Sequence, residues 1–190
     1  MTENTAAEAL RSGDPRAFAL LVDQYADSIY RLVMSIVQHQ EEAEDITQEV
    51  FTTVFTSIGQ FKGDSLLSTW MYRIAVNKCQ ELLRKQSRQK RSGKHVSYDQ
   101  AGQHHKAVQS AYMHPQLELE NNERAQILLS ALNQLPDQQR IAFTMHKIDG
   151  FSYEEIASIL DTSLSAVESL IFRGRKQLRQ LLATYYDEHF

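Results

Sequence analysis

The feature that most constrains this chain is a pair of capped helical segments near its C-terminus, separated by a short turn. In the first segment, residues 151–160, Ser152 and Glu155 have the S-x-x-E spacing of an N-terminal capping box. The second segment, residues 164–179, follows Ser163, which is the expected N-cap. A short helix, a tight turn and a longer helix ending in basic residues form the layout of a DNA-binding helix-turn-helix.

Amphipathic helical spacing covers most of the remaining chain. Apolar residues recur at three- and four-residue intervals, Pro115 and Pro136 suit helix starts, and Gly150 suits a helix end. The chain has only 7 Gly and 3 Pro and no convincing strand alternation, which argues against an all-β fold. We therefore predict an all-α chain. The helices expected before the capped pair are residues 16–38, 41–59, about 68–87, 115–135 and 137–149.

Helical periodicity disappears between about residue 91 and residue 114, where Gly, Ser, Gln and His are frequent. Such a stretch is typical of a linker between folded parts. The sequence therefore predicts two small helical domains joined by a flexible linker. The expected division is an N-terminal domain over residues 1–90, a linker over 91–114 and a C-terminal helix-turn-helix domain over 115–190.

The net charge of −4 conceals a strong separation of charge along the chain. Residues 1–60 contain ten acidic and three basic residues, whereas residues 82–98 contain six basic residues and no acid. A second basic group, from Arg173 to Arg179, lies near the C-terminus. An acidic face with two separate basic patches indicates one basic partner and one long anionic partner.

Enzymatic chemistry has no support in the sequence, since no phosphate-binding glycine loop, nucleophile elbow or paired carboxylates are evident. His104, His105 and His114 do not combine with Cys79 into a zinc-like spacing, so we expect no metal and no cofactor. The single cysteine excludes an internal disulfide. The N-terminus lacks signal-peptide features and no apolar run could span a membrane, so we expect a cytoplasmic location.

The outward face of the last helix carries side chains suited to reading DNA. Arg favours guanine, Glu can accept a hydrogen bond from cytosine and Phe can contact a thymine methyl group, while the later Arg175, Lys176 and Arg179 suit phosphates. A solvated bundle helix with cations near its C-terminus is the simpler alternative. Because a capped helix and a short turn precede this helix, we favour DNA binding. The expected contact residues are Ser165, Glu168, Ser169, Phe172, Arg173 and Lys176.

The helix expected at 41–59 presents an acidic face opposite its apolar stripe, on which Asp45, Gln48, Glu49 and Thr52 follow helical spacing. This face would repel DNA and suits a basic protein surface. Acidic residues near the start of a helix also stabilise that helix through its dipole. The residues alone leave both interpretations open.

The segment from Phe61 to Asn77 combines a glycine-containing loop with a helix that carries Trp70, Tyr72 and Arg73, and a strongly basic run follows it. Aromatic side chains near cations suit single-stranded nucleic acid, where bases stack and phosphates are neutralised. The simpler alternative is a core tryptophan followed by a solvated linker. For Trp70 taken alone, we prefer the interpretation that it is a core residue. For the loop, the aromatic residues and the basic run taken together, we prefer nucleic-acid binding.

Three segments resemble the extracytoplasmic-function sigma factors of bacteria. They are Glu42-Ala-Glu-Asp-Ile-Thr-Gln-Glu-Val-Phe51, the run from Phe61-Lys-Gly-Asp-Ser through Thr69-Trp-Met-Tyr-Arg-Ile-Ala-Val-Asn77, and Leu135-Pro-Asp-Gln-Gln-Arg140 with Gly150-Phe-Ser-Tyr-Glu-Glu-Ile-Ala157. The resemblance covers nearly the whole chain in the expected order. It implies a protein that binds core RNA polymerase, directs it to promoters and helps to open the duplex.

The resemblance also implies roles for particular residues. Asp45, Gln48 and Glu49 would contact the polymerase clamp helices, and the last helix would read duplex DNA at the −35 element. The loop and the following helix would capture a flipped base of the single-stranded −10 element, and fitted contacts can offset the few kcal/mol that extrusion costs. The −10 residues would be Phe61, Lys62, Gly63, Asp64, Ser65, Leu66, Leu67, Tyr72, Arg73, Asn77, Arg84 and Lys85.

Further expectations follow from the same resemblance. The linker would cross the polymerase toward its RNA-exit path. An anti-sigma factor at the inner membrane would hold this cytoplasmic protein, which itself does not insert into the membrane. The chain departs from many members of the family by carrying Glu168 and Leu170 where cations are usual. Our hypothesis is that Glu168 reads a cytosine or limits non-specific DNA binding.

Two other functions remain as alternatives. A free-standing helix-turn-helix regulator would usually dimerise on symmetric half-sites, but the chain has no evident heptad repeat and its acidic helix would have no role. A protein that binds single strands through the basic run alone would leave the capped helix pair unexplained.

Overall fold

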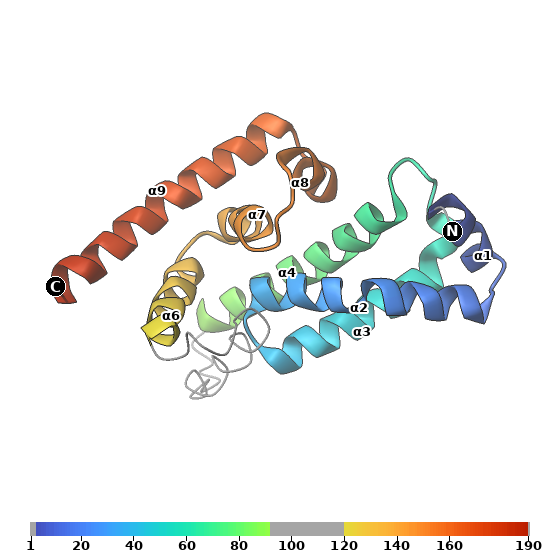
Figure 1. The fold of residues 1–190 in the computed structure, drawn as a ribbon, viewed down its shortest axis with the longest axis horizontal. Helices are drawn as coiled ribbons and strands as arrows, with labels where there is room; N and C mark the ends of the chain where they lie inside the picture. Colours follow the sequence, from blue (N-terminus) through green and yellow to red (C-terminus); the bar gives the residue numbers. More distant parts are fainter. Residues whose placement is uncertain (1–2, 92–119, 190) are drawn as a thin grey trace. The chain divides into compact units, whose positions relative to one another are not determined.

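The computed structural model describes residues 3–91 and 120–189, with side chains described for residues 7–89 and 125–183. Within these ranges the secondary structure is helical, so the all-α prediction is confirmed (Figure 1). Helices α1 to α4 form one compact unit, and α6, α7 and α9 with the first turns of α8 form a second. The elements are α1 (Glu3–Arg11), α2 (Pro15–Val37), α3 (Gln40–Ser57), the 3-10 turn η1 (Ile58–Gln60), α4 (Leu67–Arg91), α6 (Glu120–Asn133), α7 (Asp137–Lys147), α8 (Tyr153–Leu160) and α9 (Leu164–His189).

The core of the first unit lies between α2, α3 and α4, which pack on one another in all three pairings. Each helix contributes the apolar stripe that its sequence spacing indicates. Excluding water from these side chains supplies the main stabilisation of the unit. The buried residues include Ile29, Leu32, Val33 and Ile36 of α2, Ala43, Ile46, Val50 and Val54 of α3, and Met71, Ala75, Val76 and Cys79 of α4.

Local signals fix the ends of α2 and α3. The Asp14 side chain accepts a hydrogen bond from the Arg16 backbone amide at 2.9 Å, and Pro15 occupies the first turn of α2. Gln38 ends α2 with φ of 56°, in the left-handed region. The His39 Nδ1 atom then accepts from the Glu42 amide at 3.4 Å and caps α3. The tight connection makes α2 and α3 antiparallel neighbours.

The second unit is centred on α7 and α9, with α6 also packed on α9. A Cβ on Gly174 of α9 would lie 3.5 Å from the Gln139 carbonyl oxygen and 3.7 Å from Leu135 Cδ1. These are ordinary van der Waals distances, so the start of α7 lies directly against α9 at this position. Buried apolar residues of this unit include Leu132, Ile141, Met145, Ile156, Val167, Ile171 and Leu178.

Two helices differ from the sequence prediction. Helix α1 was not predicted. In its described part only Ala7 and Leu10 are buried, and two apolar positions are too few to reveal helical spacing in the sequence. Helix α4 continues to Arg91, beyond the predicted end near residue 87, through a basic stretch that has no apolar pattern. The predicted linker 91–114, apart from Arg91, and the residues 115–119 of the helix predicted after it lie outside the described residues.

Candidate nucleic-acid and protein interfaces

The turn between α8 and α9 has the capping that the sequence predicts. The Glu155 amide donates to Ser152 Oγ at 3.2 Å, and the Ser152 amide donates to Glu155 Oε2 at 2.8 Å, which completes the capping box. At the start of α9 the Ala166 amide donates to Ser163 Oγ at 3.2 Å. These bonds satisfy helix-end amides that would otherwise lack partners, and they set where both helices begin.

The C-terminal end of α8 forms a Schellman-type turn. Asp161 adopts a φ of 52°, the Thr162 amide donates to the Ala157 carbonyl at 3.0 Å, and the Asp161 amide donates to the Ser158 carbonyl at 3.4 Å. An aspartate tolerates this left-handed conformation better than most residues other than glycine and asparagine. The turn therefore needs only the three residues 161–163 before α9 begins.

The predicted DNA-contact residues of α9 share an exposed face. Its opposite side is buried at Val167, Ile171 and Leu178, so the helix is amphipathic as predicted. Phe172 is 67% exposed on this face. The exposed residues are Ser165, Glu168, Ser169, Phe172, Arg173 and Lys176.

Sequence reasoning missed polar residues that extend this face. Gln139 from the first turn of α7 and Gln177 and Gln180 of α9 line a groove of about 480 Å³ together with Arg173 and Lys176. The close approach at Gly174 brings Gln139 to α9, and no local sequence pattern reports such a contact. Two cations and several amides suit an anionic, hydrogen-bonding ligand.

A second groove of about 460 Å³ lies on another side of α9 in the same unit, and Arg175 and Arg179 line it. The sequence suggested phosphate contacts for these two arginines, yet their neighbours in the groove are mostly apolar. The remaining lining residues are Leu128, Phe143, Leu178, Leu182 and Ala183. Arginine stems cover apolar surface while their charged ends stay hydrated, which accounts for this placement without a ligand.

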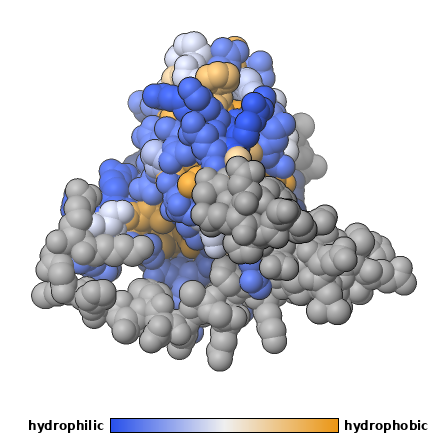
Figure 2. All heavy atoms as spheres, turned by 90° about the vertical axis from the view of Figure 1, so that its left-hand side faces the viewer, coloured by the Kyte–Doolittle hydropathy of each residue, from blue (hydrophilic) through white to orange (hydrophobic). Residues whose placement is uncertain are grey.

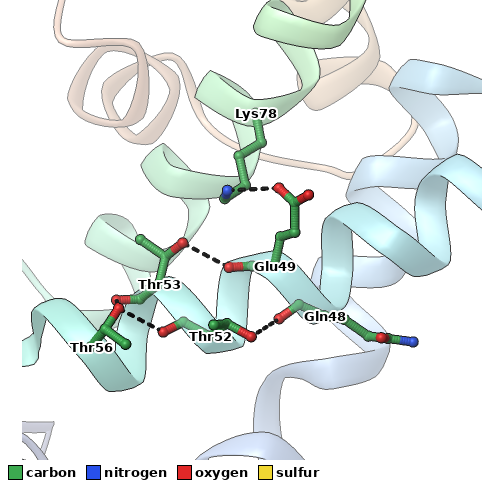
Figure 3. Close-up of polar contacts among 6 residues, drawn as sticks. All are labelled: Gln48, Glu49, Thr52, Thr53, Thr56 and Lys78. Carbon is green, nitrogen blue, oxygen red and sulfur yellow. Dashed lines mark hydrogen bonds and ion pairs between the residues drawn. The ribbon is translucent and has the colours of Figure 1, made fainter.

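The acidic face of α3 is exposed at Asp45, Gln48 and Glu49. Lys78 Nζ of α4 donates to Glu49 Oε2 at 2.8 Å, and Figure 3 shows the two side chains pointing toward each other while Gln48 points away. The ion pair leaves the Glu49 side chain 63% exposed. The face therefore keeps its negative charge accessible at Asp45 and largely accessible at Glu49.

Threonines continue this face of α3 toward its C-terminal end. The Thr52, Thr53 and Thr56 hydroxyls donate to the carbonyls of Gln48, Glu49 and Thr52 at 2.9, 2.7 and 2.9 Å (Figure 3). Because the hydroxyls turn back to their own helix, this end of the surface is less polar than its sequence suggests.

Phe55 follows on the same helix, 61% exposed, with its ring 5.2 Å from that of Phe18 in an edge-to-face arrangement. Exposed large apolar side chains are few on the described surface. Among the coloured residues in Figure 2, hydrophilic surface predominates, with smaller hydrophobic areas between.

Tyr30 of α2 has a raised pKa. Its burial disfavours the phenolate, and the negative charge of Glu44 on α3 raises the pKa further. The phenol beside the acidic helix therefore ionises only at a higher pH than an ordinary tyrosine does.

The loop predicted to bind the −10 element divides into exposed and buried parts. Lys62, Gly63, Asp64 and Leu66 are exposed, and Ser65 is partly exposed. Gly63 has φ of 82°, which favours glycine at that turn. Leu66 is 62% exposed at the end of the loop. The middle of the loop is therefore available to a ligand.

The two ends of the loop are buried. Phe61 and Leu67, predicted as DNA contacts, are 6% and 1% exposed, so in this conformation they anchor the loop in the core. The Phe61 ring lies 5.3 Å from the partly buried Trp70 ring, and Arg11 of the unpredicted α1 donates to the Phe61 carbonyl. Which residues of the loop are buried depends on packing against other elements, and the loop sequence alone does not reveal it.

The remaining predicted −10 residues lie on α4. Asn77, Arg84 and Lys85 are exposed, whereas Tyr72 and Arg73 are partly buried. Lys78, which the sequence analysis did not select, follows Asn77 and forms the ion pair with Glu49. The same helix thus carries candidate nucleic-acid residues and a direct polar link to the acidic face.

Comparison with known families gives two matches in this chain. The family described as Sigma-70 region 2 matches residues 21–89, and the family described as Sigma-70, region 4 matches residues 125–178. The first match contains α3, the 61–67 loop and most of α4, and the second contains the helix-turn-helix. None of the helices in the described part of the chain is both long enough and apolar enough to cross a bilayer.

Curated relatives extend the likeness over almost the whole chain. The chain is 33% identical over 178 residues to the ECF RNA polymerase sigma-E factor of Escherichia coli strain K12, covering 94% of this chain and 93% of that protein. It is 32% identical over 182 residues to the protein of the same name from Haemophilus influenzae, covering 94% of each chain.

Solved structures share the fold. The structure of CnrH in complex with the cytosolic domain of CnrY matches with a TM-score of 0.68 at 22% identity, covering 96% of this chain and 97% of that chain. The sigma factor RpoE of Bartonella quintana, solved in complex with the anti-sigma factor NepR, matches with a TM-score of 0.63 at 24% identity, covering 87% and 96%.

Proposed function

The chain belongs to the extracytoplasmic-function (ECF) RNA polymerase sigma factors, and from that membership we propose how its surfaces divide the work of promoter-directed transcription initiation. We infer that α3 binds core RNA polymerase, that the 61–67 loop and α4 recognise and help to melt the −10 element, and that α9 reads the −35 element. As a specificity subunit the protein would itself catalyse no reaction. The observation that carries this assignment is that each matched region presents an exposed polar face opposite a buried apolar one.

For the polymerase contact, the proposal rests on Asp45, Gln48 and Glu49. All three side chains are exposed on one helix, and two of them are acidic. A basic surface on the polymerase would gain both electrostatic steering and specific pairing from such a face. DNA would be repelled by the same charges, so the face is suited to protein rather than to promoter.

For the −10 element, the exposed middle of the loop and the exposed residues of α4 support binding of an extruded base. Gly63 and Asp64 offer backbone and side-chain polar groups, while Asn77 can read a base edge and Arg84 and Lys85 can neutralise phosphates. Phe61 and Leu67 would act indirectly, since their buried side chains hold the two ends of the loop. Melting would then follow from capture of the unpaired base.

For the −35 element, the exposed face of α9 supports insertion of that helix in the major groove. Arg173 can pair with guanine, and the exposed Phe172 ring can contact a thymine methyl group. Lys176 and the amides of Gln139 and Gln180 line a groove that suits the adjacent phosphates. Base reading and backbone positioning would thus come from neighbouring parts of one helix.

We further propose that an anti-sigma factor regulates this protein. The support is that the similar fold of RpoE from Bartonella quintana was solved with an anti-sigma factor bound. By the same proposal the chain is cytoplasmic when free and is held at the inner membrane when the anti-sigma factor is membrane-bound.

The direct test is transcription from fragmented genomic DNA by purified core RNA polymerase, with and without this protein, with RNA starts mapped by sequencing. We expect new starts that share two spaced upstream motifs. Sequence-specific duplex binding by the protein alone, without any new start, would contradict the proposal and favour a free-standing regulator.

A further inference from the structure

The ion pair between Glu49 and Lys78 joins two surfaces to which the proposed function gives different partners. Lys78 Nζ lies 2.8 Å from Glu49 Oε2 and bridges α4 to α3 across 29 residues of sequence (Figure 3). Glu49 belongs to the acidic face proposed to bind polymerase. Lys78 directly follows Asn77 on the helix proposed to bind the −10 element. Lys78 therefore neutralises a charge that polymerase binding would use, and Glu49 neutralises a charge that nucleic-acid binding would use.

The pair is built so that it can open. The Glu49 side chain is 63% exposed and uses Oε2 for the bond, so an incoming cation can reach its carboxylate. The Lys78 side chain is 24% exposed, and its bond to Glu49 lies at the surface. Exposed ion pairs are weak, equivalent to a factor of about five or less in an equilibrium. A partner that offers several charges can readily displace either half.

Helical geometry places Lys78 with other cations of α4. Lys85 lies seven residues further along, on the same side of the helix, and the exposed Arg84 precedes it. The exposed Glu81 lies three residues after Lys78 on the same side, so a lysine released from Glu49 would join a surface that carries two cations and one carboxylate. Lysine has a long flexible stem, so its amino group can move from a carboxylate to a nearby phosphate by rotation of its side chain alone.

We propose that Lys78 is a −10 nucleic-acid contact which Glu49 holds in the free protein, and that pairing of Glu49 with a polymerase cation releases it. This inference rests on the proposed function, in which α3 docks on polymerase and α4 on promoter. Polymerase docking then strengthens single-strand binding, and by thermodynamic linkage single-strand binding strengthens docking by the same factor. The ion pair thereby lowers the affinity of the free sigma factor for nucleic acid.

The test measures two affinities with the full-length chain. One is the affinity for core RNA polymerase without DNA, and the other is the affinity for a single-stranded −10 oligonucleotide, with and without core polymerase. Lys78→Gln should raise core affinity about two- to five-fold, because Glu49 loses its internal competitor. In holoenzyme the same variant should weaken oligonucleotide binding and reduce the salt slope by about 0.7, the value for one phosphate contact to a single strand.

Glu49→Gln gives the complementary result. It should raise the oligonucleotide affinity of the free protein about two- to five-fold, since Lys78 is released without polymerase. Loss of the Glu49 carboxylate also reduces general repulsion of nucleic acid, so the diagnostic readout is the change in salt slope in Lys78→Gln, which a merely structural ion pair would not produce. Arg88→Gln removes one exposed cation from the same helix and is the charge-matched control, for which core affinity should stay within two-fold.

Two outcomes would overturn the inference. One is unchanged core affinity in Lys78→Gln, and the other is an equal rise in Lys78→Gln and Arg88→Gln, which would indicate a general charge effect. Asp45→Asn separates this failure from failure of the proposed function. If Asp45→Asn weakens core binding while Lys78→Gln has no effect, the inference alone is wrong. If neither Asp45→Asn nor Glu49→Gln changes core binding, the proposed docking face is wrong and the inference falls with it.

Discussion

Arg140 Nη1 donates a hydrogen bond to Asn133 Oδ1 at 2.6 Å and so connects the second turn of α7 to the last residue of α6. The arginine is only 6% exposed, and its guanidinium also lies 3.8 Å from the Asp137 carboxylate. A buried cation is costly unless it has hydrogen-bond acceptors. These contacts therefore hold the corner between α6 and α7, from which Gln139 reaches the groove of α9.

Arg140→Ala should destabilise the C-terminal unit by about 1.5–3 kcal/mol, because it removes a charged hydrogen bond and the packing of the arginine stem. Amide hydrogen exchange is the appropriate measurement, since it reports on each unit separately. Protection should fall in α7 and α9 and remain in α2. Lys147→Ala, at the exposed end of α7, is the control and should change stability by less than about 0.5 kcal/mol. Unchanged protection in Arg140→Ala would show that the corner does not depend on the guanidinium.

Ser152→Ala should cost about 1 kcal/mol, because the Glu155 amide loses its acceptor at the start of α8. For a small domain this corresponds to a fall of about 4–8 °C in the Tm of the C-terminal unit, measured by calorimetry. Ser152→Thr keeps the hydroxyl and should restore most of the loss. Equal Tm values for the alanine and threonine variants would mean that the hydroxyl does not cap the helix.

Asp45→Arg combined with Glu49→Arg should abolish binding to core RNA polymerase, because two attractive charges on α3 become repulsive. Surface plasmon resonance with immobilised core polymerase can measure this loss. Asp23→Arg with Asp27→Arg makes the same change of charge on exposed positions of α2 and should retain binding within a few-fold. The helix-turn-helix should stay folded in both variants. Normal polymerase affinity in the α3 variant would remove the proposed interface.

Phe172→Ala should leave stability within about 0.5 kcal/mol of the parent, since the ring is 67% exposed. Burial of this ring against DNA would contribute about 1.5–3 kcal/mol, so holoenzyme affinity for a −35 duplex should fall tenfold or more. The neighbouring Ile171→Ala gives the opposite pattern, because Ile171 is 1% exposed and its loss should cost about 2–5 kcal/mol of stability. Retained duplex affinity in Phe172→Ala would exclude the ring as a contact.

Glu168→Lys should strengthen non-specific duplex binding and steepen its dependence on salt by about 0.9, the value for one added phosphate contact. Discrimination at one base position should decrease if the carboxylate accepts from a cytosine amine. Glu168→Gln separates the two effects, since it removes the charge without adding a cation. A binding-site selection experiment with each variant measures both quantities. If promoter choice and affinity are the same in all three proteins, Glu168 has neither proposed role.

Sequence alone predicted most of the helices because their signals are local. The Ser152–Glu155 box and the Ser163 cap each act within four residues, and both form as predicted. The apolar stripes of α2, α3 and α9 are likewise set by the 3.6-residue helical repeat. Family membership also followed from the order of three short motifs. These features need no knowledge of which helix contacts which.

Tertiary structure decided the features that depend on partners distant in sequence. Helix α1 was missed, yet its Arg11 donates to the Phe61 carbonyl 50 residues away. The burial of Phe61 and Leu67 at the ends of an exposed loop depends on packing against other elements. The pairing of Glu49 with Lys78 depends on how α3 lies on α4. A repeat of 3.6 residues determines which face of a helix is apolar, whereas packing determines which polar groups meet across two helices.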